Sequence, residues 1–251
     1  MKAKLYIGTS GWHYADWTGH FYPKEVKGYN ELSFHATYFN TVENNASFYR
    51  SSKQSTYAIW YKVTPESYKF SLKLNKFITH IHRLNLTTEV KEKIQYILTS
   101  TQVLKEKLGA IVIQLPASFQ YDMQILENFL NFFKQEILKF VYKPDVAIEF
   151  RNEHWFTEDL YALLEKHNVA LVDSQSSRYP EMRRLTANTA YIRMHGPEKL
   201  FASSYSPQQL EELGNYIHKI SKKVDKIYVY FNNDFHGYAL ENAQELMRIV
   251  S

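Results

Sequence analysis

The sequence predicts a single (β/α)8 barrel that extends over residues 1–251. Three observations favour it. Eight short runs have the apolar character of buried strands, most neighbouring runs are separated by a segment with helical periodicity, and no Pro-, Gly- or Ser-rich linker divides the chain. The alternative is a doubly wound open sheet. That fold would need a glycine-rich phosphate turn, and Gly8-Thr9-Ser10-Gly11 lacks the G-x-G-x-x-G spacing.

The expected strands are short and rich in β-branched and aromatic residues, as buried strands of a parallel sheet are. In chain order they are residues 4–8, 39–43, 68–74, 110–115, 146–151, 169–173, 190–195 and 226–231. Alternation of these strands with helices eight times in about 250 residues is the pattern of the barrel.

The expected helices begin and end at recognisable signals. Residues 88–108 form a long helix that Gly109 ends as a C-cap, and residues 157–167 form one that ends at Asn168. Ser206, Pro207 and Gln209 have the spacing of an N-cap, a first-turn proline and a capping box. The remaining helices are expected over residues 52–61, 122–138 and 238–249. The aromatic-rich connection 12–38 is expected to pass over the barrel mouth and to contain a helix.

Composition excludes several classes of protein. The chain contains no Cys, so a disulfide framework, a thiolate nucleophile and a Cys-ligated zinc site are excluded. The net charge is +4 and the lysines are scattered among glutamates, so a nucleic-acid partner is possible but not favoured. No apolar run is long enough to cross a bilayer and no signal-peptide pattern precedes residue 4, so we expect a cytoplasmic protein without a membrane partner. The sequence does not predict an oligomeric state.

Residues 146–155 are the part of the sequence around which the site is predicted. Glu149 and Arg151 lie two residues apart, on the same face of an alternating strand, and a helix start marked by Thr157 follows. A carboxylate and a guanidinium at the carboxyl end of a strand are typical of the rim of an active site in this fold. Alternatively, the two side chains form an ion pair that only fixes the strand end.

Every expected strand has a polar residue near its carboxyl end, where an ordinary core would have Val, Ile or Leu. The expected catalytic residues are Glu43, Glu149, Asp173 and His195. The expected substrate-binding residues are Ser10, Trp12, Asn45, Lys73, Gln114, Arg151, Arg193, Tyr230, Asn232 and Gly237. We expect the charged members of this set to line one cavity.

The charges at the strand ends alternate in sign, and this decides between two chemistries. The three acids and His195 could bind a metal, but Lys73, Arg151 and Arg193 would compete for the same carboxylates, so neither a metal nor a cofactor is predicted. The three cations suit a small anionic ligand, since arginine makes bidentate contacts with carboxylate and phosphate. Gly196, Gly237 and the helix start near Tyr238 are expected to add backbone N–H groups at the same rim. Glu149 is the expected group for proton transfer.

The chain also resembles the domain-of-unknown-function family 72, the YecE-like proteins. The segments that resemble the family are 7–12, 39–43, 47–49, Lys73, 79–80, 114–116, 149–151, Trp155, 191–196, 230–233, 236–239 and 242–243. The resemblance implies a TIM-type barrel and no particular reaction. The polar loop from Asp173 to Thr189 is longer than the family pattern leads us to expect, so Gln175 and Arg178 are not assigned to the site.

Three kinds of function remain open from the sequence. The first is an enzyme that uses acid/base catalysis on an anionic substrate. The second is a metal-dependent isomerase or phosphodiesterase. The third is a non-catalytic ligand- or RNA-binding protein, which the aromatic residues Trp12, Phe48, Tyr49, Trp155 and Tyr230 would suit, although aromatic packing explains most of them.

Overall fold

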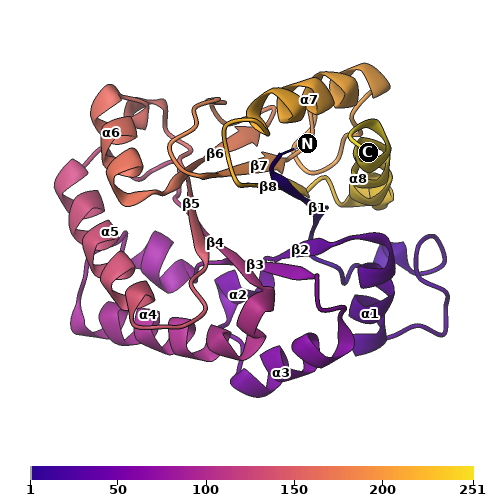
Figure 1. Ribbon diagram of the computed structural model, residues 1–251, viewed down its shortest axis with the longest axis horizontal. Helices are drawn as coiled ribbons and strands as arrows, with labels where there is room; N and C mark the ends of the chain where they lie inside the picture. The colour runs from indigo at the N-terminus through magenta and orange to yellow at the C-terminus, as the bar shows by residue number, and fades with distance from the viewer. Residues whose placement is uncertain (1) are drawn as a thin grey trace.

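The computed structural model describes residues 2–251 and contains eight parallel strands in a closed barrel (Figure 1). Each strand pairs with the next one along the chain, and β1 pairs with β8 to close the ring. The strands are β1 Lys4–Ser10, β2 Thr41–Asn44, β3 Lys69–Lys73, β4 Leu108–Gln114, β5 Asp145–Glu149, β6 Ala170–Gln175, β7 Thr189–Met194 and β8 Lys226–Phe231. The predicted (β/α)8 barrel is confirmed, and each predicted strand is present with its ends shifted by at most about two residues.

Helices surround the barrel on all sides (Figure 1). The longer ones are α1 Tyr29–Tyr38, α3 Gln54–Val63, α4 Thr88–Thr101, α5 Met123–Leu138, α6 Glu158–His167, α7 Pro207–Ile220 and α8 Tyr238–Ile249. Shorter helical segments are α2 Ala46–Tyr49, η1 Ala15–Trp17, η2 Phe77–Ile81, η3 Gln102–Lys107, η4 Glu153–Trp155 and η5 Phe235–Gly237. No helix within residues 2–251 combines the length and the apolar character needed to span a membrane.

The predicted helix caps are largely confirmed. Ser206 and Gln209 form the capping box at the start of α7, and Pro207 occupies the first turn. The side chains of Asp122 and Thr157 accept hydrogen bonds from backbone N–H groups at the starts of α5 and α6. Asn168 ends α6 in the left-handed conformation.

The prediction that Gly109 is the C-cap of a long helix is wrong. Helix α4 ends at Thr101, the chain continues as the 3-10 segment η3, and Gly109 lies inside β4. Phe70 of β3 pairs with Leu108, whereas Leu72 pairs with Ile111, so β4 has an extra residue there. A glycine inside a strand often marks such a bulge, because the displaced backbone leaves little room for a side chain.

The inside of the barrel has an unusually polar and aromatic lining. Tyr191, Tyr228 and Tyr230 occupy its middle together with small residues, which belong to one buried cluster: Ala110, Val112, Ala147, Ala170 and Val172. The alternation along each strand then places Glu149 of β5 and Arg193 of β7 inside as well, one step closer to the carboxyl ends. Leu171 and Ile192, by contrast, face the helices.

Close packing of β1 against β2 explains why residue 8 is a glycine. A Cβ atom on Gly8 would lie 2.1 Å from the carbonyl oxygen of Thr41. Any other residue would therefore force the two strands apart directly below Ser10 and Glu43.

The first and last connections meet over one side of the barrel mouth. The Trp17 indole is fully buried, and its Nε1 donates a hydrogen bond to the carbonyl oxygen of Asp234 at 3.1 Å. Residues of η1 and η5 are also in contact. The connection 12–38 thus contains both the expected excursion over the mouth and the expected helix, α1.

Candidate functional site

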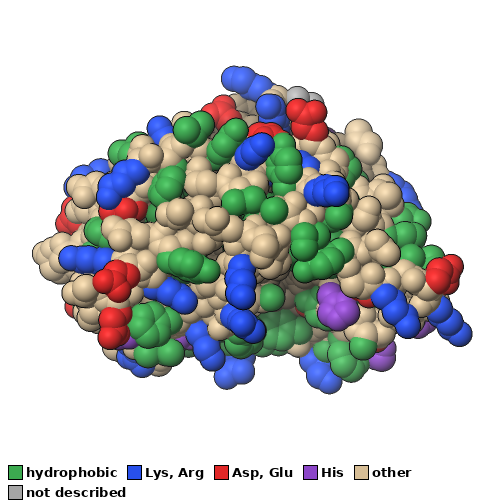
Figure 2. Space-filling model, turned by 90° about the horizontal axis from the view of Figure 1, so that it is seen from below, with side chains coloured by type: hydrophobic (Ala, Val, Ile, Leu, Met, Phe, Trp, Pro, Cys, Tyr) green, Lys and Arg blue, Asp and Glu red, His purple; other side chains and the backbone are tan. Residues whose placement is uncertain are grey.

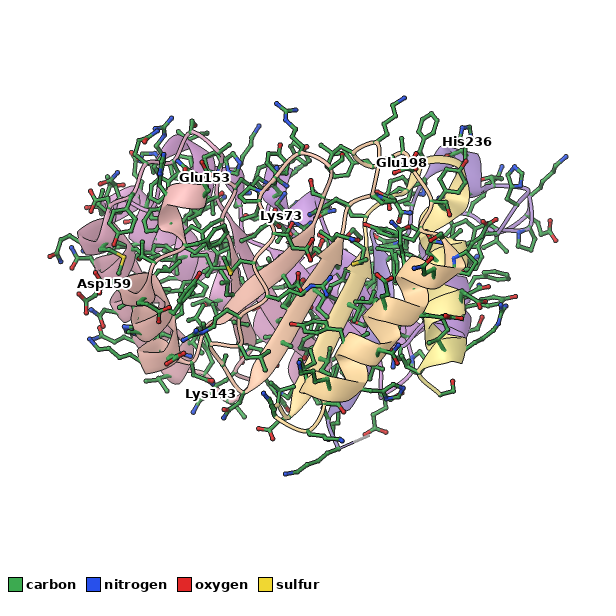
Figure 3. All side chains as sticks on the ribbon, turned by 90° about the horizontal axis from the view of Figure 1, so that it is seen from above. Lys73, Lys143, Glu153, Asp159, Glu198 and His236 are labelled. Atoms are coloured by element: carbon green, nitrogen blue, oxygen red, sulfur yellow. The ribbon has the colours of Figure 1, made fainter. Side chains whose placement is uncertain are left out.

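The charged residues gather at one end of the barrel. Figure 3 shows Lys73 at the same end as Glu153, Glu198 and His236, which follow β5, β7 and β8, whereas Lys143 lies at the opposite end. This is the end at which all eight strands terminate, and it is where barrels of this class place their chemistry. We call it the barrel mouth.

Arg193 lies in the middle of the barrel mouth between two carboxylates. Its Nη2 donates to Glu43 Oε1 at 2.7 Å, and its Nη1 donates to Glu149 Oε2. Glu43 also accepts hydrogen bonds from Ser10 Oγ at 2.7 Å and Tyr191 OH at 2.6 Å. Burial would raise the pKa of Glu43, but Arg193 and these hydroxyl donors lower it below its usual value. Both carboxylates and the guanidinium are almost completely buried, so the three groups form one fixed charge cluster.

Glu149 has a second cation beside it. Arg151 Nε donates to Glu149 Oε1 at 2.8 Å, and the guanidinium of Arg151 stacks 4.2 Å from the ring centre of Tyr179 in the β6–β7 loop. Burial raises the pKa of Glu149, but the charges of Arg193 and Arg151 lower it well below the usual range. Glu149 is therefore ionised at neutral pH. Among residues 2–251, Arg151 donates only through Nε, and its side chain keeps 14% of its surface exposed.

Lys73 is the last residue of β3 and therefore also lies at the barrel mouth. Its Nζ lies 4.1 Å above the ring of Phe48, and within the described chain it donates no hydrogen bond and forms no ion pair. The ring face stabilises an ammonium group. Burial and the nearby charge of Arg193 act in the opposite direction, and the pKa of Lys73 is lowered to about 7.

Two histidines also face the mouth. His195 is buried, its Nδ1 is 2.9 Å from Asn232 Nδ2, and its Nε2 is 3.8 Å from Glu149 Oε1, which is too far for a hydrogen bond. His80 lies on the π-helical segment η2, with its Nδ1 2.9 Å from Thr79 Oγ1 and its ring against Phe48. Burial and the charge of Lys73 lower the pKa of His80 to about 4, so its imidazole is neutral at pH 7.

Several buried polar atoms at the mouth have no hydrogen-bond partner within residues 2–251. They are Asn45 Oδ1, Ser174 Oγ, Gln175 Oε1, Arg193 Nε and His195 Nε2. A buried polar atom without a partner costs about 1–3 kcal/mol, so such atoms are rare unless a ligand or water binds to them. All five belong to residues at, or directly after, the carboxyl ends of β2, β6 and β7. Four of them belong to residues on the inward faces of their strands and indicate a place for a polar ligand, whereas Gln175 lies on the same face of β6 as Asp173.

The structure brings most of the predicted site residues together, but several have a different position from the one expected. Ser10 and Gln114 are buried beside the charge cluster, where Ser10 bonds to Glu43 and Gln114 Nε2 donates to the carbonyl oxygen of Leu115. Tyr230 lies deeper still, because its hydroxyl is bonded to Thr41 Oγ1 at 2.7 Å and Ser71 Oγ at 2.8 Å. Trp12 packs at right angles on Trp60 of α3 and is partly exposed.

Asp173 lies outside the barrel mouth, contrary to the prediction that it lines the cavity. In β6 the inward residues are Val172 and Ser174, so Asp173 faces the helices, where its Oδ2 is 3.5 Å from Arg183 Nε. Burial raises the pKa of Asp173 to about 7, with Arg183, Glu181 and Tyr216 as its titrating neighbours.

The free backbone N–H groups that were expected at Gly196 and Gly237 are also absent from the described residues. The Gly196 N–H donates to Tyr205 OH at 2.8 Å, and the Gly237 N–H donates to the carbonyl oxygen of Asp234 at 3.2 Å. Asn233 and Asn242 fill the space between these loops with side-chain hydrogen bonds. Both glycines have positive φ angles, so the turn geometry accounts for them.

The donor set of the barrel mouth does not favour a metal. No three His, Asp or Glu side chains of residues 2–251 are grouped as metal ligands. The oxygens of Glu43 and Glu149 already accept hydrogen bonds from arginine, as the sequence led us to expect for competing cations.

A separate groove of about 910 Å³ lies outside the barrel, between α2, η2 and α4. Figure 2 shows basic and hydrophobic side chains interspersed on the face of the molecule that α3 and α4 cover. The groove contains charges of both signs, for example Lys76 and Lys93 beside Glu89 and Glu92. It does not reach Glu149 or Arg193, so we assign the candidate site to the barrel mouth.

Ionisable side chains that converge at the carboxyl ends of a closed parallel barrel define a TIM-barrel protein with a polar site at its mouth. The chain belongs to the family described as "Protein of unknown function DUF72", which matches residues 6–251. It is similar to the UPF0759 protein YunF of Bacillus subtilis (strain 168). The two are 24% identical over an alignment of 276 positions, which covers 98% of this chain and 94% of the relative.

Solved structures agree with this family. A DUF72 family protein from Thermotoga maritima MSB8 superposes with a TM-score of 0.83 at 25% identity and covers 98% of this chain and 99% of its own. One from Enterococcus faecalis V583 gives 0.81 at 20% identity, covering 98% and 95%. D-psicose 3-epimerase shares the fold, with a TM-score of 0.54 at 10% identity over 89% of this chain and 92% of its own.

The sequence prediction missed His80 and Tyr191 as residues of the mouth. Tyr191 precedes Arg193 by two residues in β7, so strand alternation places both on the same face and could have identified it. His80 follows β3 in a single π-helical segment, for which no periodicity exists, and only the family resemblance drew attention to it.

Proposed function

We propose that the chain is an enzyme that acts on a small substrate carrying a carboxylate or phosphate group at the barrel mouth. The observation that carries the proposal is the charge balance. Two carboxylates, Glu43 and Glu149, neutralise two guanidiniums, Arg193 and Arg151, which leaves the ammonium of Lys73 without a partner within residues 2–251. A surplus positive charge in a partly buried site favours an anionic ligand.

The groups best placed to hold the anion are Lys73 and Arg151. Both are partly exposed, and the terminal nitrogens of Arg151 project beyond its single bond to Glu149. Arg193 has a different role, since both of its Nη atoms are engaged by carboxylates and it is almost fully buried. It fixes Glu43 and Glu149 and so holds the floor of the site.

Proton transfer is better assigned to Lys73 than to Glu149. An anion that drew Arg151 away would still leave Glu149 paired with Arg193, so its pKa would remain low. Lys73, with a pKa of about 7, exchanges protons readily near neutral pH. His80 is neutral there, but with a pKa of about 4 it is a weaker base than Lys73. Glu149 then serves to position the cations.

Anion-induced thermal stabilisation tests the proposal. Phosphate, sulfate and citrate should raise the melting temperature of the wild-type protein, because they bind the folded state only. Lys73→Met should weaken this binding by about tenfold or more, equivalent to about 1.4 kcal/mol. Binding should also weaken as the pH rises from 6 to 8, because Lys73 loses its proton through that range.

The matched control is Lys76→Met, since Lys76 is an exposed lysine three residues away that lies over Tyr49 instead. This variant should keep the wild-type response to each anion. Equal responses of the wild type and Lys73→Met would overturn the proposal.

A further inference from the structure

Lys107 and Lys73 differ in what surrounds their ammonium groups. Lys107 Nζ donates to three oxygens, namely Tyr61 O at 2.6 Å, Thr64 O at 2.7 Å and Thr64 Oγ1 at 3.2 Å. Lys73 Nζ has a phenyl ring on one side and no acceptor within residues 2–251. An ammonium with three acceptors is held as a structural donor. An amine without acceptors has its nitrogen available for a reaction.

The surroundings of Lys73 favour the neutral amine. Burial contributes most to lowering its pKa to about 7, followed by the charge of Arg193; Arg151 acts in the same direction, whereas Glu149 and Glu43 oppose the shift. A large fraction of the Lys73 side chains is therefore unprotonated at neutral pH, whereas an ordinary lysine is almost completely protonated. Desolvation and neighbouring cations are the means by which lysine becomes a nucleophile towards carbonyl groups.

We propose that Lys73 forms a Schiff base with the carbonyl carbon of a small anionic aldehyde or ketone bound at the barrel mouth. The inference rests on the proposed function, because Arg151 holds the carboxylate or phosphate of the same molecule. The nucleophile, the anion-binding guanidinium and the unpartnered atoms of Asn45 and Ser174 all lie at the carboxyl ends of the strands.

The step is balanced without an oxidant or reductant. The lone pair of the neutral Lys73 Nζ attacks the carbonyl carbon, and the carbonyl π electrons move to oxygen. The resulting carbinolamine loses one proton from nitrogen and its hydroxyl group, which leave together as water, and a C=N bond remains. Protonation of this imine restores the surplus positive charge that the Lys73 ammonium carried, so the anionic part of the bound molecule keeps its partner.

His80 and Phe48 support this chemistry. The Phe48 ring contacts both groups, with its centre 4.1 Å from Lys73 Nζ and 4.8 Å from the ring centre of His80. The imidazole of His80 is neutral at pH 7, so it places no further positive charge beside the amine. The phenyl ring covers one side of the amine and keeps water from it.

Reductive trapping tests the inference. The full-length protein is incubated with pyruvate or dihydroxyacetone phosphate in the presence of sodium cyanoborohydride, digested, and analysed by mass spectrometry. The expected result is a reduced adduct on the peptide that contains Lys73, with at least about tenfold preference over the exposed Lys76. Acetic anhydride labelling at several pH values provides a second measurement, because the Lys73 amine should react with a midpoint near pH 7.

Two substitutions separate the roles of this residue. Lys73→Arg keeps a positive charge but cannot form an imine, so it should retain phosphate stabilisation and lose the adduct. Lys73→Met should lose both. Lys76→Met should keep both, since Lys76 projects away from the mouth over Tyr49.

Absence of an adduct at Lys73 with both probes, or equal labelling of Lys73 and Lys76, would overturn the Schiff-base inference. If phosphate still stabilised the protein through Lys73, the proposed function would survive that failure. An adduct at Lys73 in a protein that does not respond to phosphate would instead support carbonyl chemistry and contradict the anion proposal. A labelling midpoint near pH 10 would count against the inference even without a suitable carbonyl probe.

Discussion

The two ends of the barrel both contain charged residues inside the ring of strands, but only one of them is incomplete. At the amino end, Lys226 Nζ binds Asp145 Oδ2 at 2.9 Å, and Tyr228 OH donates to the same oxygen at 3.1 Å. At the carboxyl end, the charge cluster is surrounded by polar atoms without partners in residues 2–251, among them Arg193 Nε and His195 Nε2. Charged residues inside a barrel therefore do not by themselves indicate a site. Buried polar atoms that lack a hydrogen-bond partner do indicate one.

The largest expected effect tests whether the carboxyl end is a tightly coupled cluster. Arg193→Met would leave Glu43 and Glu149 buried close to each other with one of their cations missing. We expect a loss of about 3–5 kcal/mol in the free energy of unfolding, measured by urea denaturation. Combining it with Glu43→Gln and Glu149→Gln should restore part of the loss.

Arg248→Met is the control for that measurement, because Arg248 forms an exposed ion pair with Glu245. Its effect should not exceed about 0.5 kcal/mol. A similarly small effect of Arg193→Met would show that the cluster is not coupled.

Lys73→Met should change the free energy of unfolding by an intermediate amount that depends on pH. The folded-state pKa is about 7 and the unfolded value is about 10.4, so the unfolded chain binds more protons between these values and stability rises with pH there. Below pH 7 the cost of burying the ammonium is fully present. Lys73→Met should therefore be more stable than the wild type at pH 6, by about 1–2 kcal/mol after allowance for partial exposure.

This advantage should shrink as the pH rises above 7 and be nearly gone at pH 10, where the folded-state amine is neutral and the unfolded-state amine is close to its own pKa of about 10.4. Parallel urea titrations of the wild type and Lys73→Met at pH 6, 8 and 10 would measure it. A difference that stays constant across the three pH values would contradict the lowered pKa.

The smallest effect is expected at the amino end. Lys226→Met removes one partner of Asp145, but this pair is partly exposed and Asp145 keeps the hydroxyl of Tyr228. We expect a loss of about 1 kcal/mol or less in unfolding free energy. Because this site is already complete, phosphate should stabilise Lys226→Met and the wild type equally. Loss of the phosphate response in this variant would contradict the distinction between the two ends.

Strand periodicity was sufficient to predict the barrel and most of the charge cluster. Glu43, Glu149 and Arg193 lie on the expected face, because successive side chains of a strand point strictly to opposite faces of the sheet. Asp173 was misplaced because β6 is apolar on both faces, from Ala170 to Val172, so no alternation indicates which side is inward.

Depth and hydrogen-bond satisfaction could not be predicted from the sequence. Tyr230 was expected to bind substrate, yet its hydroxyl is bonded to Thr41 and Ser71 below the cluster, and strand alternation does not indicate how far a long side chain reaches across the barrel. Gly196 and Gly237 were expected to present free N–H groups, but Tyr205 and Asp234 occupy them through contacts that no local pattern indicates.

The contact between Trp17 and Asp234 has a consequence for how the molecule folds. The two residues are 217 positions apart, and Arg193 meets Glu43 across 150 positions. Such contacts form only after long loops have been closed, which is slow compared with local helix formation. The barrel mouth is therefore among the last parts of the chain to be completed, and the N-terminal half of the protein remains without its site until β7 and β8 are in place. In refolding experiments, formation of the phosphate-responsive state should coincide with the slowest phase of tryptophan burial.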